Sequence, residues 1–184
     1  ALLELKANMQ RQCVFIQGEA DWCHKSAETL LHSFDSSKSI WLATNADNSK
    51  AVIAHKQAQS RLGKEFDLIV FDATEQFPPD SFGVIVGTLT AGGIMLVLLA
   101  KETTSPWLQR FKKIAAQYAQ EDDHFHFVQQ DDSLPTLSLL KQQEVSNDKQ
   151  YKSLDQEQAV EAIFKVVHGH RRRPLVISSD RGRG

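Results

Sequence analysis

The stretch Asp67-Leu-Ile-Val-Phe-Asp72 is apolar at every position between its terminal aspartates, and Ile94-Met-Leu-Val-Leu-Leu99 is apolar throughout. Neither run alternates between apolar and polar residues, so both faces of each strand are expected to be buried. Strands of this kind are typical of a parallel sheet that carries helices on both sides. These runs therefore predict an α/β fold.

Strands and helices alternate outward from these runs. Ala91-Gly92-Gly93 is expected to form a tight turn before the second run. The alternation predicts a Rossmann-like three-layer α/β domain with a mainly parallel sheet over residues 1–140. The expected strands are 13–16, 39–43, 67–72, 94–99 and 125–128, and the expected helices are 2–9, 20–34, 49–62, 78–89 and 105–118.

The composition is that of a soluble globular protein. The chain has 184 residues, of which 41% are hydrophobic and 24% charged, with a net charge of −2. Its longest apolar run, 94–100, is too short to span a bilayer, so we expect no membrane partner and a cytoplasmic location. Cys13 and Cys23 are interpreted as small core residues rather than as a disulfide.

A second module is expected to begin near residue 153. Residues 141–152 are polar and without periodicity, which indicates a linker, and Val160, Ile163, Phe164 and Val167 then mark one face of a helix that ends at Gly169. The strand Pro174-Leu-Val-Ile177 leads into a glycine-rich end. A strand followed by such a loop favours the start of a P-loop ATPase domain over 153–184.

The glycine-rich end resembles a phosphate-binding loop that stops before its lysine. Gly182 and Gly184 would let backbone N–H groups approach a phosphate closely, and Ser179 stands where such a loop usually has its first glycine. The alternative is a flexible Arg/Gly tail. The candidate ATP-binding residues at this end are Ser179, Asp180, Arg181, Gly182, Arg183 and Gly184.

Gln158 is a candidate for recognition of adenine. A glutamine amide can donate a hydrogen bond to adenine and accept one from it, and Gln158 lies just upstream of the predicted P-loop strand. The alternative is an ordinary exposed helix glutamine. We predict no catalytic residue in the chain. We also predict no metal site, since the pairs His124/His126 and His168/His170 have no further ligand at suitable spacing.

The first domain lacks the signature of a cofactor site. Its first strand is followed by the single Gly18, and the second strand ends in Ala43-Thr-Asn45 without an acidic residue for a ribose. Asp72 is expected to cap a neighbouring turn. Trp107, Phe111 and Tyr118, together with Ile114, are expected to face the core rather than stack on bases, and Arg171-Arg-Arg173 is interpreted as a solvated loop rather than an RNA contact.

The chain resembles the bacterial tRNA(Met) cytidine acetyltransferase family. The resemblance is most specific over 62–99, including Ile69-Val-Phe-Asp-Ala73 and Gly87-Thr-Leu-Thr-Ala-Gly92, and over 173–184. In that family the Arg-Gly-Arg-Gly run continues with Lys-Ser. The resemblance implies a full protein that forms N4-acetylcytidine at the wobble position of elongator tRNA(Met) from acetyl-CoA, with hydrolysis of ATP or GTP.

The same resemblance implies an accessory role for residues 1–140. Only Gln158 and the loop up to Gly184 correspond to nucleotide-binding residues of the family. This chain alone would therefore be inactive, and its N-terminal domain would dock on the remaining domains of the same polypeptide and help to position tRNA. The alternatives are a part of another helicase-like nucleic-acid ATPase, or a Rossmann-like binding domain that stands alone.

Overall fold

The computed structural model describes residues 10–32, 38–45, 52–135 and 154–169. Contacts divide the chain into two compact units, Ala1–Leu140 and Lys141–Gly184, and each is described here by itself. The expected helix over 2–9, the linker and the glycine-rich end lie outside the described residues.

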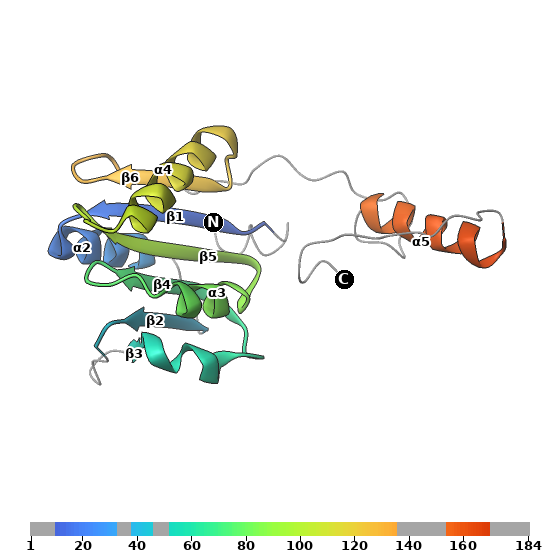
Figure 1. Cartoon of the computed structure of the whole chain (residues 1–184), viewed down its shortest axis with the longest axis horizontal. Coiled ribbons are helices and arrows are strands. Elements are labelled where there is room, and N and C mark those ends of the chain that lie inside the picture. The colour runs from blue at the N-terminus through green and yellow to red at the C-terminus, as the bar shows by residue number, and fades with distance from the viewer. Residues whose placement is uncertain (1–9, 33–37, 46–51, 136–153, 170–184) are drawn as a thin grey trace. The chain divides into compact units, whose positions relative to one another are not determined.

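The first unit is built on a six-stranded, entirely parallel sheet with the strand order β3-β2-β4-β5-β1-β6 (Figure 1). This confirms the predicted Rossmann-like α/β class. The elements are β1 (Gln12–Gly18), α2 (Ala20–His32), β2 (Ser39–Ala43), β3 (Val52–Ala54), the 3₁₀ helix η1 (His55–Arg61), β4 (Phe66–Ala73), α3 (Pro79–Val86), β5 (Leu89–Ala100), α4 (Pro106–Glu121) and β6 (Phe125–Gln129).

Helices cover both faces of the sheet, which accounts for the uninterrupted apolar runs. On one face, alternate strand residues such as Val70 and Leu96 pack with Cys23 and Ala27 of α2. On the other face, the intervening residues pack against η1, α3 and α4, of which the last two lie in front of the sheet in Figure 1. β4 and β5 are central and have cores on both sides, so nearly every side chain in them is buried.

The prediction of a helix over 49–62 is wrong. The described part of that stretch forms β3, which extends the sheet by pairing Trp41 with Val52, followed by η1. Adjacent Val52 and Ile53 are β-branched and favour a strand, and a parallel partner was available in β2. Gly63 follows η1 with a φ of +80°, a conformation that glycine adopts readily, so the predicted stop lies where expected.

The expected turn at Ala91-Gly92-Gly93 is also wrong, because these residues lie inside β5. The pairing of β4 with β5 is irregular here: Phe66 pairs with Leu89, but Leu68 pairs with Ile94, so β5 has extra residues between these two pairs. A Cβ atom at Gly93 would lie 2.7 Å from Leu89 Cδ1 and 3.0 Å from the carbonyl oxygen of Asp67. The glycine is therefore required because the backbone of β5 passes close to Leu89 of the same strand and to Asp67 of β4.

α4 presents a different face to the core than its apolar residues predict. Leu108, Lys112 and Ala115 are buried, whereas Trp107, Ile114 and Tyr118 are exposed and only Phe111 of the expected set packs partly against the core. Lys112 can occupy the buried face because its stem is apolar and its ammonium group donates to the carbonyl oxygens of Ala100 and Lys101. The expectation that the exposed residues belong to the core is thus wrong.

The described part of the second unit is the helix α5 (Leu154–Val167). It ends as predicted at Gly169, whose φ is +73° and whose N–H donates to the carbonyl oxygen of Val166. Ile163, Phe164 and Val167 are exposed within the residues described. None of the described helices is long and apolar enough to cross a membrane.

Candidate functional site

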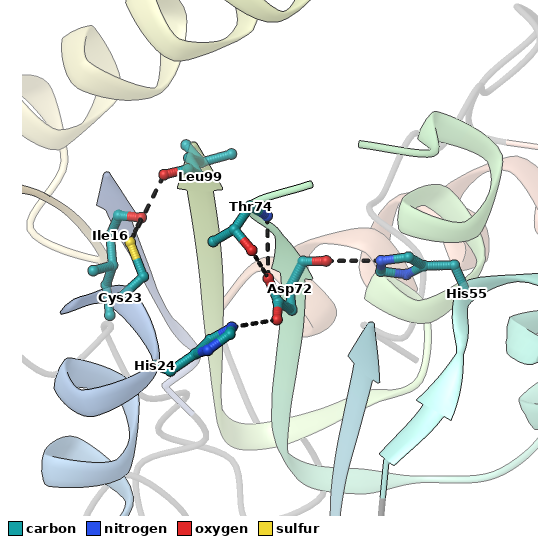
Figure 2. A network of polar contacts seen from close by, with 7 residues as sticks. All are labelled: Ile16, Cys23, His24, His55, Asp72, Thr74 and Leu99. Carbon is teal, nitrogen blue, oxygen red and sulfur yellow. Dashed lines mark hydrogen bonds and ion pairs between the residues drawn. The ribbon is translucent and has the colours of Figure 1, made fainter. Parts of the chain in front are cut away.

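Asp72 lies at the carboxyl end of β4, at the centre of a polar network (Figure 2). Strand alternation places its side chain on the same face as Val70, the face that α2 covers. Its Oδ1 accepts hydrogen bonds from the Thr74 N–H at 3.1 Å and the Thr74 hydroxyl at 2.7 Å. Asp72 therefore caps the turn after β4, as predicted.

The second carboxylate oxygen of Asp72 binds His24. Nε2–H of His24, in α2, donates to Oδ2 at 2.6 Å, while the His24 side chain is 39% exposed and the Asp72 side chain only 9%. The imidazole also packs against Trp41, with the two rings steeply inclined to each other. The carboxylate therefore fixes the orientation of the imidazole and determines that Nε2 carries a proton.

His55 approaches Asp72 from the other side. Its Nε2–H donates to the main-chain oxygen of Asp72 at 2.7 Å, and its ring packs on Phe71 with centroids 4.6 Å apart. Burial lowers the pKa of His55, opposed in part by the bond to Asp72 and by the Asp72 charge. His55 is thus neutral at pH 7, and its Nδ1 has no hydrogen-bond partner among the described residues.

Cys23 and Cys13 are inert thiols in this environment. Cys23 Sγ lies 3.6 Å from the carbonyl oxygen of Ile16 and 3.8 Å from that of Leu99 (Figure 2). Burial, together with the nearby Asp72 charge, raises the pKa of Cys23 to about 11, and burial raises the pKa of Cys13 to about 12. Neither thiol is ionised near neutral pH, which fits the expected core role.

The crevice between the carboxyl ends of β1 and β5 is the position where folds of this kind usually bind a nucleotide, because helices leave the two strands toward opposite faces. Here the end of β1 is bonded to both of its neighbours, to the residue after β5 on one side and to the residue after β6 on the other. Gln17 Nε2 donates to the carbonyl oxygen of Lys101 at 2.8 Å, and Gln130 Oε1 accepts from the N–H of Glu19 at 3.0 Å. A Cβ atom at Gly18 would lie 2.8 Å from Trp22 Cε3.

The charges at this crevice also oppose an anion. Glu19 and Asp21 lie at the start of α2, and both are exposed. A helix N-terminus attracts phosphate through free N–H groups, but here the first of these is already bonded to Gln130 and two carboxylates stand beside it. The single-glycine turn noted in the sequence is therefore packed against the domain's own side chains.

A cavity of about 400 Å³ lies between α4 and β6, lined among others by Ala116, Ala119 and His126. Burial lowers the pKa of His126. Nearby, His124 Nδ1 lies 2.7 Å from Asp122 Oδ1, and the bonds with His124 lower the pKa of Asp122. No group of three or more potential ligands gathers for a metal ion within the described residues.

The predicted nucleotide-binding residues are placed only in part. Gln158 lies in α5, where it is exposed. The remaining candidates, Ser179 to Gly184, lie outside the described residues, as does Arg171-Arg-Arg173. The predicted nucleotide site therefore stays a prediction.

The residues that the sequence did not single out are His24, His55 and Lys112, which surround the carboxyl ends of β4 and β5. Asp72 lies two residues after Val70 in the same strand, so the alternation of strand side chains does predict that both point to the same face. The helix that covers that face cannot be read from one sequence, because the strand order is not known.

The fold and these contacts define the class of the protein. It has a Rossmann-like parallel α/β domain in which side chains of the domain itself bond the groups at the carboxyl ends of the strands, and a second unit follows in the same chain. Residues 1–136 match the sequence profile of a family described as tRNA(Met) cytidine acetyltransferase TmcA, N-terminal. The chain belongs to this family.

Two curated relatives show how far the similarity extends, and both are named tRNA(Met) cytidine acetyltransferase TmcA. The protein of Nitrosococcus halophilus is 32% identical over 97% of this chain and 28% of its own length. That of Vibrio cholerae is 30% identical over 97% of this chain and 24% of its own length. The chain thus spans about a quarter of the length of these relatives.

Proposed function

We propose that this chain is the N-terminal part of an ATP-dependent RNA acetyltransferase that acts in the cytoplasm. The complete protein transfers the acetyl group of acetyl-CoA to N4 of the wobble cytidine in elongator tRNA(Met). The observation that carries the proposal is similarity over 97% of this chain to two relatives named for a cytidine acetyltransferase of tRNA(Met). The family name itself supports a transferase with a role in tRNA processing.

The domain of residues 1–140 is proposed to be an accessory module that docks on the rest of the polypeptide and helps to position tRNA. Two features support this role. The turn at Gly18 after β1 is packed against Trp22 and Gln130, and the carboxylate of Asp72 is engaged by Thr74 and His24. Neither place offers unoccupied groups of the kind that bind a nucleotide.

Residues 153–184, after a linker at 141–152, are proposed to begin the ATPase module. Gln158 would read adenine, and the loop Ser179 to Gly184 would surround the phosphates, continuing into a lysine and a serine. Support comes from α5, which presents an exposed Gln158 and ends at Gly169 before the predicted loop strand. Without that lysine, ATP would bind poorly, because the lysine supplies a full positive charge at the β- and γ-phosphates.

Mass spectrometry of tRNA(Met) from a strain that lacks the gene tests the activity. We expect N4-acetylcytidine to disappear from the wobble position and to return when the full-length gene is restored. Unchanged N4-acetylcytidine in the deletion strain would contradict the proposed reaction.

A filter-binding assay tests the accessory role. It compares the full-length protein with a version that lacks residues 1–140, measuring affinity for tRNA(Met) and acetylation rate on the same preparations. We expect at least one of the two to fall. If both were unchanged, the domain would contribute nothing to docking or to tRNA positioning.

A further inference from the structure

One side of α4 is apolar and yet exposed. Trp107, Ile114 and Tyr118 expose 46%, 40% and 52% of their surface. They follow one another at intervals that keep them in a single row along the helix, and the half-buried Phe111 lies between them. We call Trp107, Phe111, Ile114 and Tyr118 the α4 stripe.

The α4 stripe is held in place by aromatic contacts from below. Trp107 stacks on Phe111 with ring centroids 5.5 Å apart and contacts Phe77 at 5.0 Å. Tyr118 packs against Phe125 at 5.9 Å. Side chains fixed in this way lose little conformational freedom on binding, which is the property of a preorganised contact surface. Exposed apolar rows with polar borders are typical of interaction sites.

Arg110 is exposed beside the α4 stripe, but the charges at the C-terminal end of the row are acidic and favour a protein surface over RNA. Glu121, Asp122 and Asp123 lie one turn beyond Tyr118, at the end of the helix where its dipole is also negative. An aspartate is ionised at neutral pH, and the bonds of Asp122 with His124 lower its pKa further. A phosphate backbone along the row would be repelled at this end, and Ile114 has no ring on which a base could stack.

We propose that the α4 stripe is the surface on which a later module of the same polypeptide docks, through an apolar patch that has basic residues at one border. This inference rests on the proposed function, because it assumes that the polypeptide, like its relatives, has further modules and that one of them is the partner. The chain covers 28% and 24% of two relatives, so most of each polypeptide lies outside the matched part.

The modest size of the α4 stripe fits a tethered partner. Stable complexes between separate proteins bury about 1,200–2,000 Å² in total, which a row of four side chains on one helix does not supply. A partner on the same chain is present at an effective concentration in the millimolar range, so a small contact suffices. The same reasoning disfavours a second copy of the chain.

Photo-crosslinking in the full-length protein tests the proposal. p-Benzoylphenylalanine is introduced in place of Tyr118 or, as a control, in place of Gln109, an exposed residue on the other side of the buried face of α4. We expect position 118 to crosslink within the same chain to peptides beyond residue 184, and position 109 not to do so. Crosslinks from position 118 only to tRNA, only to a second copy, or to nothing would overturn the proposal.

A charge placed in the row provides a second, matched measurement. Ile114→Glu and Gln109→Glu each add one carboxylate to an exposed position of α4, and circular dichroism verifies that both fold. Ile114→Glu should lower the intramolecular crosslink yield from position 118 about tenfold, because an unpaired carboxylate is excluded from an apolar contact. Equal yields in the two variants would overturn the proposal.

The acetylation assay on these preparations separates the two proposals. Intramolecular crosslinks from a protein that leaves tRNA(Met) unacetylated would support docking while removing the proposed reaction. Acetylation by a protein without such crosslinks would support the reaction and overturn docking through α4.

Discussion

Replacing Asp72 with alanine removes the centre of the network at the carboxyl end of β4. The carboxylate accepts three hydrogen bonds, from the Thr74 N–H, the Thr74 hydroxyl and Nε2–H of His24. Asp72→Ala leaves these donors without their acceptor, although the bond of the His55 ring to the main-chain oxygen of residue 72 remains possible. We expect a loss of stability without a change of fold.

The size of the loss follows from the three bonds. Each Thr74 donor contributes about 1 kcal/mol. The bond to His24 would be stronger if it were buried, but the His24 side chain is 39% exposed, so about 1 kcal/mol is appropriate there as well. The sum is about 3 kcal/mol, which lowers the melting temperature of a domain of this size by about 10 °C.

Urea denaturation at pH 7, followed by circular dichroism, measures this loss. Two matched variants divide it: Asp72→Asn keeps an oxygen for Thr74 and should cost about 1 kcal/mol, and Thr74→Val removes only the hydroxyl and should also cost about 1 kcal/mol. The reasoning is refuted if Asp72→Ala changes the free energy of unfolding by less than about 0.5 kcal/mol, the range of ordinary surface substitutions. It is equally refuted if Asp72→Asn costs as much as Asp72→Ala.

Three further predictions concern the core and the buried groups. Gly18→Ala should destabilise the domain by about 1–3 kcal/mol, because the new Cβ would lie 2.8 Å from an indole carbon of Trp22. Gly83→Ala has open space in α3 and should stabilise by up to about 1 kcal/mol, so the melting temperature should fall in the first variant and rise in the second. Folding lowers the pKa of His55 below its ordinary 6.5, so just below that pH the unfolded state binds more protons and the free energy of unfolding falls on acidification. His55→Gln should make this fall smaller, as measured by urea titrations at pH 7 and 5.5. Iodoacetamide at pH 8 should leave Cys13 and Cys23 unmodified in the native protein and label both in urea, since their pKa values are about 12 and 11; rapid native labelling would contradict the burial argument.

The sequence predicted the architecture where one physical signal dominates. The apolar runs of β4 and β5 require cover on both faces, and this alone indicates a parallel sheet. Prediction failed where two signals compete. Over 49–62 a helical pattern was preferred to the β-branched pair Val52-Ile53, although an available neighbour in β2 makes the strand favourable.

α4 was misread for a related reason. Spacing identifies a row of apolar residues, but a helix can carry more apolar surface than the sheet beneath it covers. Lys112 occupies the core-facing side because two carbonyl oxygens at the end of β5 receive its ammonium group. That arrangement needs β5 and α4 to be in place, so no local pattern reveals it, and the displaced row remains at the surface.

The candidate site divides in the same way. The capping of Thr74 by Asp72 is local and was predictable, because an aspartate at the end of a strand commonly bonds the backbone two residues later. His24 and His55 reach Asp72 across 48 and 17 residues of sequence, through α2 and η1. Their positions depend on strand order, which a single sequence does not specify.

The contacts around Gly18 fit the accessory role that we propose for this domain. A Rossmann-like fold places a helix N-terminus beside the central strands, and related folds use it for phosphate because its N–H groups are free. Here Gln130 bonds the first of these groups, Glu19 and Asp21 bring negative charge, and Gly18 lies against an indole. The start of α2 is therefore bonded and packed by residues of the domain itself. The exposed row of α4 is then the described feature of this domain that is best suited to bind another part of the protein.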